Sequence, residues 1–124
     1  CKVNGAQVSR SLLCDGEIVS GGHIDRSVVG VRSLVGEDAV LDEVVMMGAS
    51  HFDTPSERGD KPALGVGAGS EVRRAIIDVD ARIGTGCRLI NAEGREEADG
   101  DGWCIRDGVV VVYRGGILPP GTVV

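Results

Sequence analysis

Aliphatic residues recur every six positions along much of this 124-residue chain. In the segment RRAIIDVDARIGTGCRLIN, the residues Ile77, Ile83 and Leu89 are each six positions apart. This spacing matches neither the roughly 3.6-residue period of an amphipathic helix nor the alternation of a half-buried strand. The sequence therefore indicates a different kind of regular structure.

The same pattern appears elsewhere as a small residue followed two positions later by an aliphatic one. The pairs are Ala6/Val8, Gly16/Ile18, Gly22/Ile24, Ser33/Val35, Ala39/Leu41, Ser70/Val72, Ala81/Ile83, Cys87/Leu89, Gly115/Ile117 and Gly121/Val123. Longer similarity begins at Val8, Ile24, Leu41 and Val72, in steps of 16 and 17 residues followed by one longer step. The longer step predicts an insertion between Leu41 and Val72.

Hexapeptides grouped in threes predict an all-β fold, the left-handed parallel β-helix. Each short strand forms one flat side of a triangular coil, with its aliphatic residue pointing inward and a small residue near the corner. We expect one domain over residues 1–124 with about five to six coils. Two segments without the pattern, 48–67 and 91–103, predict extruded loops. After the second loop the pattern resumes at Ile105, Val111, Ile117 and Val123.

Composition narrows the classes of function. Hydrophobic residues make up 42% of the chain and aromatic residues 2%, so the core must consist of small aliphatic side chains. The formal charge of −6 argues against binding to nucleic acid or to an anionic membrane surface. The four cysteines form no C-x-x-C pair and are interpreted as reduced thiols. Without a long apolar run or a secretion signal, we expect a cytoplasmic protein.

Metal and catalytic motifs are weak. Glu97, Asp99 and Asp101 alternate as in a calcium loop, but Gly108 stands where that loop needs glutamate, which favours a solvated acidic loop. His23 and His51 are the two histidines, too few for a three-histidine zinc site. His23 is predicted to point outward from a flat side, and His51 lies in the first loop. We expect no metal site and no catalytic residue here.

Several long blocks of the sequence resemble one known family. They are SVVGVRSLVGEDAVLDEVVMMGA, FDTPSER, GVGAGSEVRRAIIDVDARIG, INAEGREEADGDGWCIRDGVVVV and the terminal GTVV. Together they resemble the C-terminal β-helix domain of the glucose-1-phosphate adenylyltransferases, also called ADP-glucose pyrophosphorylases, and most closely the cyanobacterial and plant-type branch. The resemblance extends along nearly the whole chain.

This resemblance implies a regulatory and oligomerisation domain. The parent enzyme would make ADP-glucose and pyrophosphate from ATP and glucose 1-phosphate, for glycogen or starch synthesis. Its ATP and Mg²⁺ would belong to an N-terminal nucleotidyltransferase domain, which is absent from this sequence, so the chain alone is expected to be non-catalytic and without a cofactor. The implied partners are that catalytic domain, further subunits of a tetramer, and small anionic effectors such as 3-phosphoglycerate or phosphate. A plant source would imply a plastid location.

The resemblance also suggests where an effector binds. Two lysines that commonly serve the anionic effector in this family fall at Val79 and Arg114, of which Arg114 alone keeps a positive charge. An anion site in an acidic domain also requires a local reversal of charge. On that ground the weaker candidates are the arginines expected to face outward, Arg73, Arg74, Arg82 and Arg88, together with the neighbouring Arg32. The alternative is that they are surface residues paired with Glu71, Asp78 and Asp80.

Two other classes of function stay open from the residues alone. A hexapeptide-repeat acyltransferase is the first, normally a trimer with active sites between subunits and a histidine as general base. A purely structural β-helix subunit without a ligand is the second. The oligomeric state distinguishes the acyltransferase, which would be a trimer, from the adenylyltransferase domain.

Overall fold

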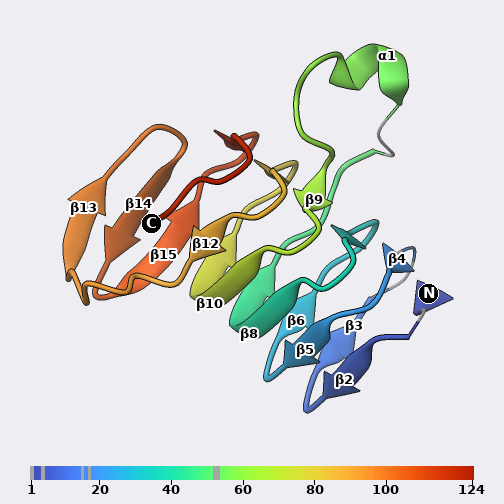
Figure 1. The fold of residues 1–124 in the computed structure, drawn as a ribbon, viewed down its shortest axis with the longest axis horizontal. Helices are drawn as coiled ribbons and strands as arrows, with labels where there is room; N and C mark the ends of the chain where they lie inside the picture. The colour runs from blue at the N-terminus through green and yellow to red at the C-terminus, as the bar shows by residue number, and fades with distance from the viewer. Residues whose placement is uncertain (1, 4, 15, 17, 52–53) are drawn as a thin grey trace.

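The computed structural model describes residues 2–3, 5–14, 16, 18–51 and 54–124 and confirms an all-β parallel solenoid (Figure 1). Six parallel strands form its first flat side, one strand per coil. In spatial order they are β1 (Lys2–Val3), β4 (Ile18–Val19), β7 (Leu34–Val35), β9 (Gly65–Val66), β11 (Arg82–Ile83) and β16 (Ile117–Leu118). The expected five to six coils are thus present in the described part of the chain.

Two further flat sides complete each coil. The second side contains β2 (Gln7–Ser9), β5 (His23–Asp25), the first halves of β8 (Val40–Met46) and β10 (Glu71–Ile77), and β12 (Arg88–Leu89). The third side contains β3 (Leu12–Leu13), β6 (Val28–Val29), the second halves of β8 and β10, and β15 (Val109–Val112). Because β8 and β10 continue around a corner, each contributes to two sides.

The core is a stack of aliphatic side chains in register. Ile24, Leu41, Val72 and Leu89 occupy equivalent positions of successive coils, and each is at most 1% exposed. Ile77 and Ile83, from the segment that first showed the six-residue spacing, are each 1% exposed on the other two sides. Side chains of this size fill the narrow triangle, which explains how a chain almost without aromatic residues can form a core.

Buried serines connect neighbouring coils near the corners. The Ser70 hydroxyl donates a hydrogen bond to the carbonyl of Gly84 over 2.8 Å and accepts one from the N–H of Cys87 over 3.1 Å. The Ser27 hydroxyl donates to the carbonyl of Asp25 in its own coil and accepts a hydrogen bond from the N–H of Val44 on the next coil. These hydroxyls satisfy backbone groups that would otherwise be buried without partners, so the small corner residues have a bonding role as well as a steric one.

The predicted inward positions are wrong near the C-terminus. Ile117 and Val123 are 40% and 69% exposed, and Val111 is half-buried. The buried residues are instead their neighbours Val110, Val112, Leu118 and Val124. At Ile117 the reason is that buried Gly116, rather than Gly115, occupies the place equivalent to Ala81, which moves that inward position by one residue. Val111 and Val123 are in register with the outward-facing Ile76 and Arg88.

Two predicted inward positions near the N-terminus are also exposed. Val19 fills the core in register with Val35, so Ile18 points outward and is 37% exposed. Val8 is in register with the buried Ile24, as predicted, but is 37% exposed because it belongs to the first coil of the stack.

The first extruded loop is confirmed. It leaves after Met46, contains the short helix α1 (Pro55–Arg58), and returns at β9. Figure 1 shows α1 projecting away from the coils. The strands on either side of the loop still pair directly, with Leu41 in register with Val72. The insertion therefore leaves the stacking of coils unchanged.

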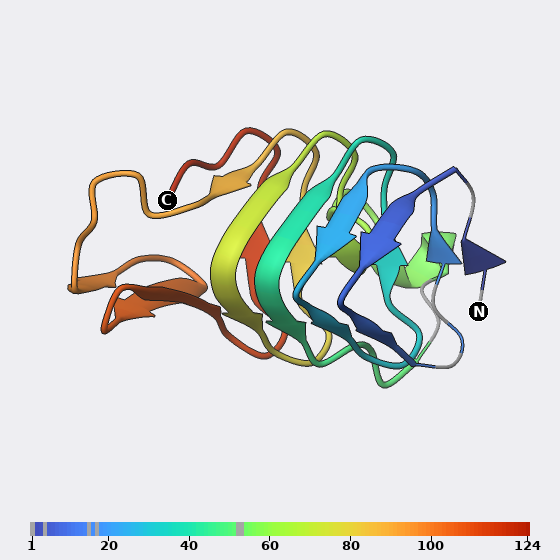
Figure 2. The same cartoon turned by 90° about the horizontal axis from the view of Figure 1, so that it is seen from below.

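The second predicted loop is mostly a β-hairpin. Strands β13 (Glu97–Asp99) and β14 (Trp103–Arg106) are antiparallel, and β14 pairs in turn with β15. Figure 2 shows this hairpin extending past the coils at the C-terminal end of the stack. Ile105 lies on β14 and not on a coil, so the repeat resumes at β15, later than predicted. No helix in the described residues is long and apolar enough to cross a membrane.

Candidate anion-binding site

Val79 and Arg114 occupy the same corner on adjacent coils. Each lies two residues beyond a paired position, since Ile77 is in register with Val112. The N–H of Gly115 donates to the carbonyl of Val79 over 2.9 Å, which fixes this relation. Adjacent coils are spaced like neighbouring strands, about 4.8 Å apart. Cations at both of these positions would face one anion together. In this chain only Arg114 carries a positive charge, because the other position is Val79.

Asp80 is the acidic residue of the corner and is bound by the base of the first loop. The N–H and hydroxyl of Ser50 donate to its two carboxylate oxygens over 2.8 and 2.7 Å. Partial burial favours a higher pKa for the Asp80 carboxyl, but these hydrogen bonds and the nearby His51 and Arg114 outweigh it and lower the pKa. Asp80 is therefore ionised at neutral pH, with much of its charge already engaged.

His51 is brought to this corner by the same contact. Its Nδ1 lies 3.1 Å from the Ser50 hydroxyl and 3.8 Å from an Asp80 oxygen. The imidazole is exposed at the surface. We name the group of Ser50, His51, Val79, Asp80 and Arg114 the Arg114 corner.

Arg32 borders the Arg114 corner on the side of the preceding coils. Its Nε donates to the carbonyl of Ala49 over 2.9 Å, immediately before Ser50. The Arg114 side chain is exposed, and no carboxylate in the described residues lies within ion-pair distance of it. A planar guanidinium in this state can bind a phosphate or carboxylate through two parallel hydrogen bonds.

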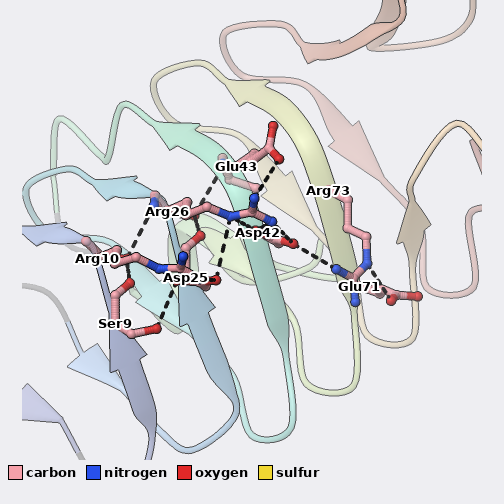
Figure 3. Close-up of polar contacts among 11 residues, drawn as sticks. Ser9, Arg10, Asp25, Arg26, Asp42, Glu43, Glu71 and Arg73 are labelled. Carbon is pink, nitrogen blue, oxygen red and sulfur yellow. Dashed lines mark hydrogen bonds and ion pairs between the residues drawn. The ribbon is translucent and has the colours of Figure 1, made fainter.

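Arg73 and Arg88 do not lie at the Arg114 corner. Arg73 is bound to Asp42 over 3.0 Å and to Glu71 over 2.9 Å, and Arg88 lies 3.5 Å from Glu71. Figure 3 shows that the contacts of Arg73 continue a ladder of alternating charges across successive coils, through Arg26 and Asp25 to Arg10. Arg73 and Arg88 therefore form ion pairs with carboxylates of the protein itself. This agrees with the alternative interpretation of the sequence, in which these arginines are paired surface residues.

Arg82 contradicts the expectation that it faces solvent. It lies on β11 and is 7% exposed, because the returning end of the first loop covers it. Its guanidinium donates to the carbonyl of Pro62 over 2.9 Å. The same loop segment borders an apolar groove of about 370 Å³. Arg82 therefore anchors the loop and is not available to a ligand from solution.

Arg74 is exposed and borders a separate groove of about 350 Å³. Asp42 and Glu43 also line that groove, so it carries both signs of charge. Arg73 lines the groove as well, but its guanidinium is already paired with Asp42 and Glu71.

The remaining candidates are separate from this corner. His23 is exposed on β5, between Gln7 and Val40 of the neighbouring strands. Glu97 and Asp99 lie on the hairpin strand β13, where Asp99 pairs with Arg106 over 2.8 Å. Within the described residues no group of three metal-ligating side chains is present. Cys14, Cys87 and Cys104 are free thiols, and Cys1 lies outside the described residues.

Ser50 is a residue of the Arg114 corner that the sequence analysis missed. Asp80 was considered only as a partner for arginines, whereas its actual donor lies 30 positions earlier in the chain. The insertion between these two residues hides their proximity. The pairing of Leu41 with Val72 is the available signal, since it aligns the coil that precedes the loop with the coil that follows it.

The parallel stack, six-residue sides and aliphatic core define a left-handed parallel β-helix domain. Residues 1–123 match the family model described as the GLGC left-handed parallel beta-helix domain, and the chain belongs to this family. It is 37% identical over 131 aligned positions to the glucose-1-phosphate adenylyltransferase small subunit, chloroplastic/amyloplastic, of Triticum aestivum. The alignment covers 99% of this chain and 28% of the wheat protein, so the chain spans little more than a quarter of that relative. These matches do not favour a hexapeptide-repeat acyltransferase.

Proposed function

We propose that this chain is the regulatory and oligomerisation domain of a glucose-1-phosphate adenylyltransferase. That enzyme joins ATP and glucose 1-phosphate into ADP-glucose and pyrophosphate, for glycogen or starch synthesis. Family membership along the whole chain supports the assignment, together with similarity to the wheat small subunit. The Arg114 corner is the proposed binding site for a small anionic effector.

The single observation that carries the regulatory role is the register of Val79 and Arg114. These positions are separated by 35 residues in the sequence but lie at one corner of adjacent coils, where Val79 is half-buried and Arg114 is exposed. The exposed Arg114 guanidinium provides the charge and the paired donors that a phosphate or carboxylate needs. Since Asp80 is already bound by Ser50, its repulsion of an incoming anion is reduced.

The catalytic chemistry is assigned to a nucleotidyltransferase domain of the same longer polypeptide. In this proposal ATP and Mg²⁺ bind there, and this chain supplies no catalytic residue. The domain's partners are that catalytic domain and the other subunits of a tetramer. The proposed location is the cytoplasm, or the plastid for a plant protein.

Pyrophosphate release by the full-length enzyme tests this function. The assay contains ATP, glucose 1-phosphate and Mg²⁺, with 3-phosphoglycerate or phosphate added over a range of concentrations. We expect Arg114→Gln to weaken the response to these anions several-fold while basal activity persists. Arg88→Gln is the matched control, since it removes the same charge from the second flat side, on β12.

Two results would contradict the proposal. A full-length enzyme without adenylyltransferase activity would contradict the assigned reaction. An unchanged effector curve for Arg114→Gln would remove the role of this corner, and a loss of response in Arg88→Gln alone would move the site to the charge ladder.

A further inference from the structure

The third flat side of the solenoid carries an aliphatic residue at its outward position on five successive coils. These residues are in register from coil to coil and are Leu12, Val28, Val45, Ile76 and Val111. Leu12 is 61% exposed, and Val28, Val45 and Ile76 are 38%, 41% and 42% exposed. Because neighbouring coils are about 4.8 Å apart, the five residues form a strip about 19 Å long, which we name the aliphatic stripe.

The other two flat sides differ in the described residues. The outward rows of the second side are mostly polar or charged, and they include Asp42 and Arg73 of the charge ladder (Figure 3). On the first side the outward row is interrupted by Gly65 and Arg82. Since the core uses only inward side chains, a continuous aliphatic row on the outside of one side indicates a contact surface.

Charged side chains border one edge of the aliphatic stripe. Arg26, Glu43 and Arg74 occupy equivalent positions of successive coils at this corner, as the register of the flanking residues shows. Glu43 lies 3.3 Å from Arg26. Arg74 has no carboxylate within ion-pair distance in the part of the chain that the structure describes. This edge therefore presents an unpaired cation one coil away from an exposed carboxylate.

We propose that a second copy of this chain docks on the third flat side. The two copies lie face to face about a two-fold axis that runs parallel to the strands, between the coils of Val45 and Ile76. This symmetry sets Val45 against Ile76 of the second copy, so that the two aliphatic stripes cover each other. It also sets Arg74 opposite Glu43 of the second copy, which supplies the partner that Arg74 lacks within its own chain.

The charges at the edge select this axis among the alternatives. An axis on the coil of Val45 would set Glu43 against its own copy. An axis one coil nearer the N-terminus would pair Glu43 with Arg26, which already binds Asp42 and Glu43 in its own chain. An axis along the stack would press the Glu43 carboxylate onto the exposed Met47 of the other copy, which is unfavourable for a charge.

This inference rests on the proposed oligomerisation role and gives it a surface and a partner. A stripe one residue wide buries less area than a standard stable interface, so we expect the isolated chain to dimerise in the micromolar range. Sedimentation velocity of the 124-residue chain, from micromolar to millimolar concentration, measures the dissociation constant of the dimer.

A charge on the stripe tests the surface. Ile76→Glu is expected to weaken the dimer at least roughly tenfold, because the two-fold axis buries the added carboxylate in both copies. Ile117→Glu is the matched control, since Ile117 is 40% exposed but lies on the first flat side, and it should leave the dissociation constant unchanged. Circular dichroism establishes that both variants are folded.

A charge exchange tests the position of the axis. Glu43→Arg and Arg74→Glu should each weaken the dimer several-fold, because each sets like charges against each other across the interface. The double variant should recover the affinity of the unmodified chain, since it restores opposite charges with their places exchanged. A double variant that is weaker than both single variants would overturn the proposed axis.

The outcomes separate this inference from the proposed function. A chain that stays monomeric at all concentrations, or an Ile76→Glu variant that still dimerises as tightly, overturns the docking of a second copy. If the chain is monomeric while Ile76→Glu destabilises the full-length enzyme, the rest of the polypeptide covers this side instead. In either case an effector response that depends on Arg114 would leave the proposed regulatory function in place.

Discussion

Leu41 lies directly beside Val72 on the next coil, and both side chains are fully buried although an inserted loop separates them in the sequence. Contacts of this kind make each coil depend on its neighbours, since a single coil buries no apolar surface alone. The stability of the domain therefore lies mostly in the interfaces between coils.

Shortening Leu41 tests this dependence. We expect Leu41→Ala to lower the free energy of unfolding by about 2–5 kcal/mol, because it removes buried methyl groups and leaves a cavity between coils. Val45→Ala on the same strand is the control, since Val45 is 41% exposed and should cost less than about 1 kcal/mol. Urea unfolding followed by circular dichroism measures both, and equal losses in the two variants would contradict the proposed core.

Gly84 tests how closely successive corners approach. A Cβ built on Gly84 would lie 2.6 Å from the backbone nitrogen of Pro120 on the next coil, so we expect Gly84→Ala to cost about 1–3 kcal/mol. Gly86→Ala is the comparison, because a Cβ there meets no atom within 4 Å although the φ angle is +66°. It should cost about 1 kcal/mol through backbone strain alone. Thermal unfolding of the two variants separates steric overlap from strain, and a harmless Gly84→Ala would mean that the coils can move apart.

A cation at position 79 should strengthen the Arg114 corner. We expect Val79→Lys to tighten sulfate binding by about 1 kcal/mol, or roughly fivefold, since the new charge lies one coil from Arg114. Val31→Lys places the same charge at the same corner two coils away from position 79, and it should change the affinity less. Sulfate titration of both variants provides the measurement. Equal gains would show that the effect comes from overall charge and not from this site.

Asp25 should make the stability of the domain depend on acid pH. Hydrogen bonds from Arg10, then from Ser9, lower the pKa of its carboxyl in the folded chain despite some desolvation. A carboxyl with a lower pKa when folded stabilises the protein above its unfolded pKa, near 4, and loses this contribution as the pH falls through the folded value. Asp25→Asn should therefore be less stable than the unmodified chain at pH 7, with the difference shrinking as the pH falls through the lowered pKa of the folded chain.

Urea unfolding at a series of pH values tests this expectation. Glu37→Gln is the control, because the exposed Glu37 side chain has no ion pair among the described residues. A difference between Asp25→Asn and the unmodified chain that stays constant as the pH falls would show that the ion pair is not its cause.

The sequence predicts the inward residues well in the coils at the middle of the stack. Ile77, Ile83 and Leu89 are buried as the spacing requires. The predicted inward position is wrong by one residue where two adjacent residues fit the pattern equally well. Gly115 and Gly116 are both small enough for the corner, and four consecutive valines precede them, so alternation cannot show which side chains face inward. Only the register with the preceding coil determines which of these side chains face inward.

The hairpin and the buried arginine show two further limits. The Asp-Gly repeats between Glu97 and Trp103 are a turn signal that the sequence analysis did not use, and they form the hairpin turn. Arg82 lies at a position that the six-residue pattern predicts to face outward, but the inserted loop folds back over it. Local periodicity fixes the direction of a side chain and carries no information about a distant segment that covers it.

The register of Val79 with Arg114 has a consequence for comparing members of this family. A sequence alignment scores these two positions independently, yet a cation at either one presents its charge to nearly the same point in space. In the proposed site, a relative can therefore carry its cation at either of these two positions and present a similar charge to the anion. The quantity that selection can maintain at such a corner is the total charge across coils, whichever residue supplies it.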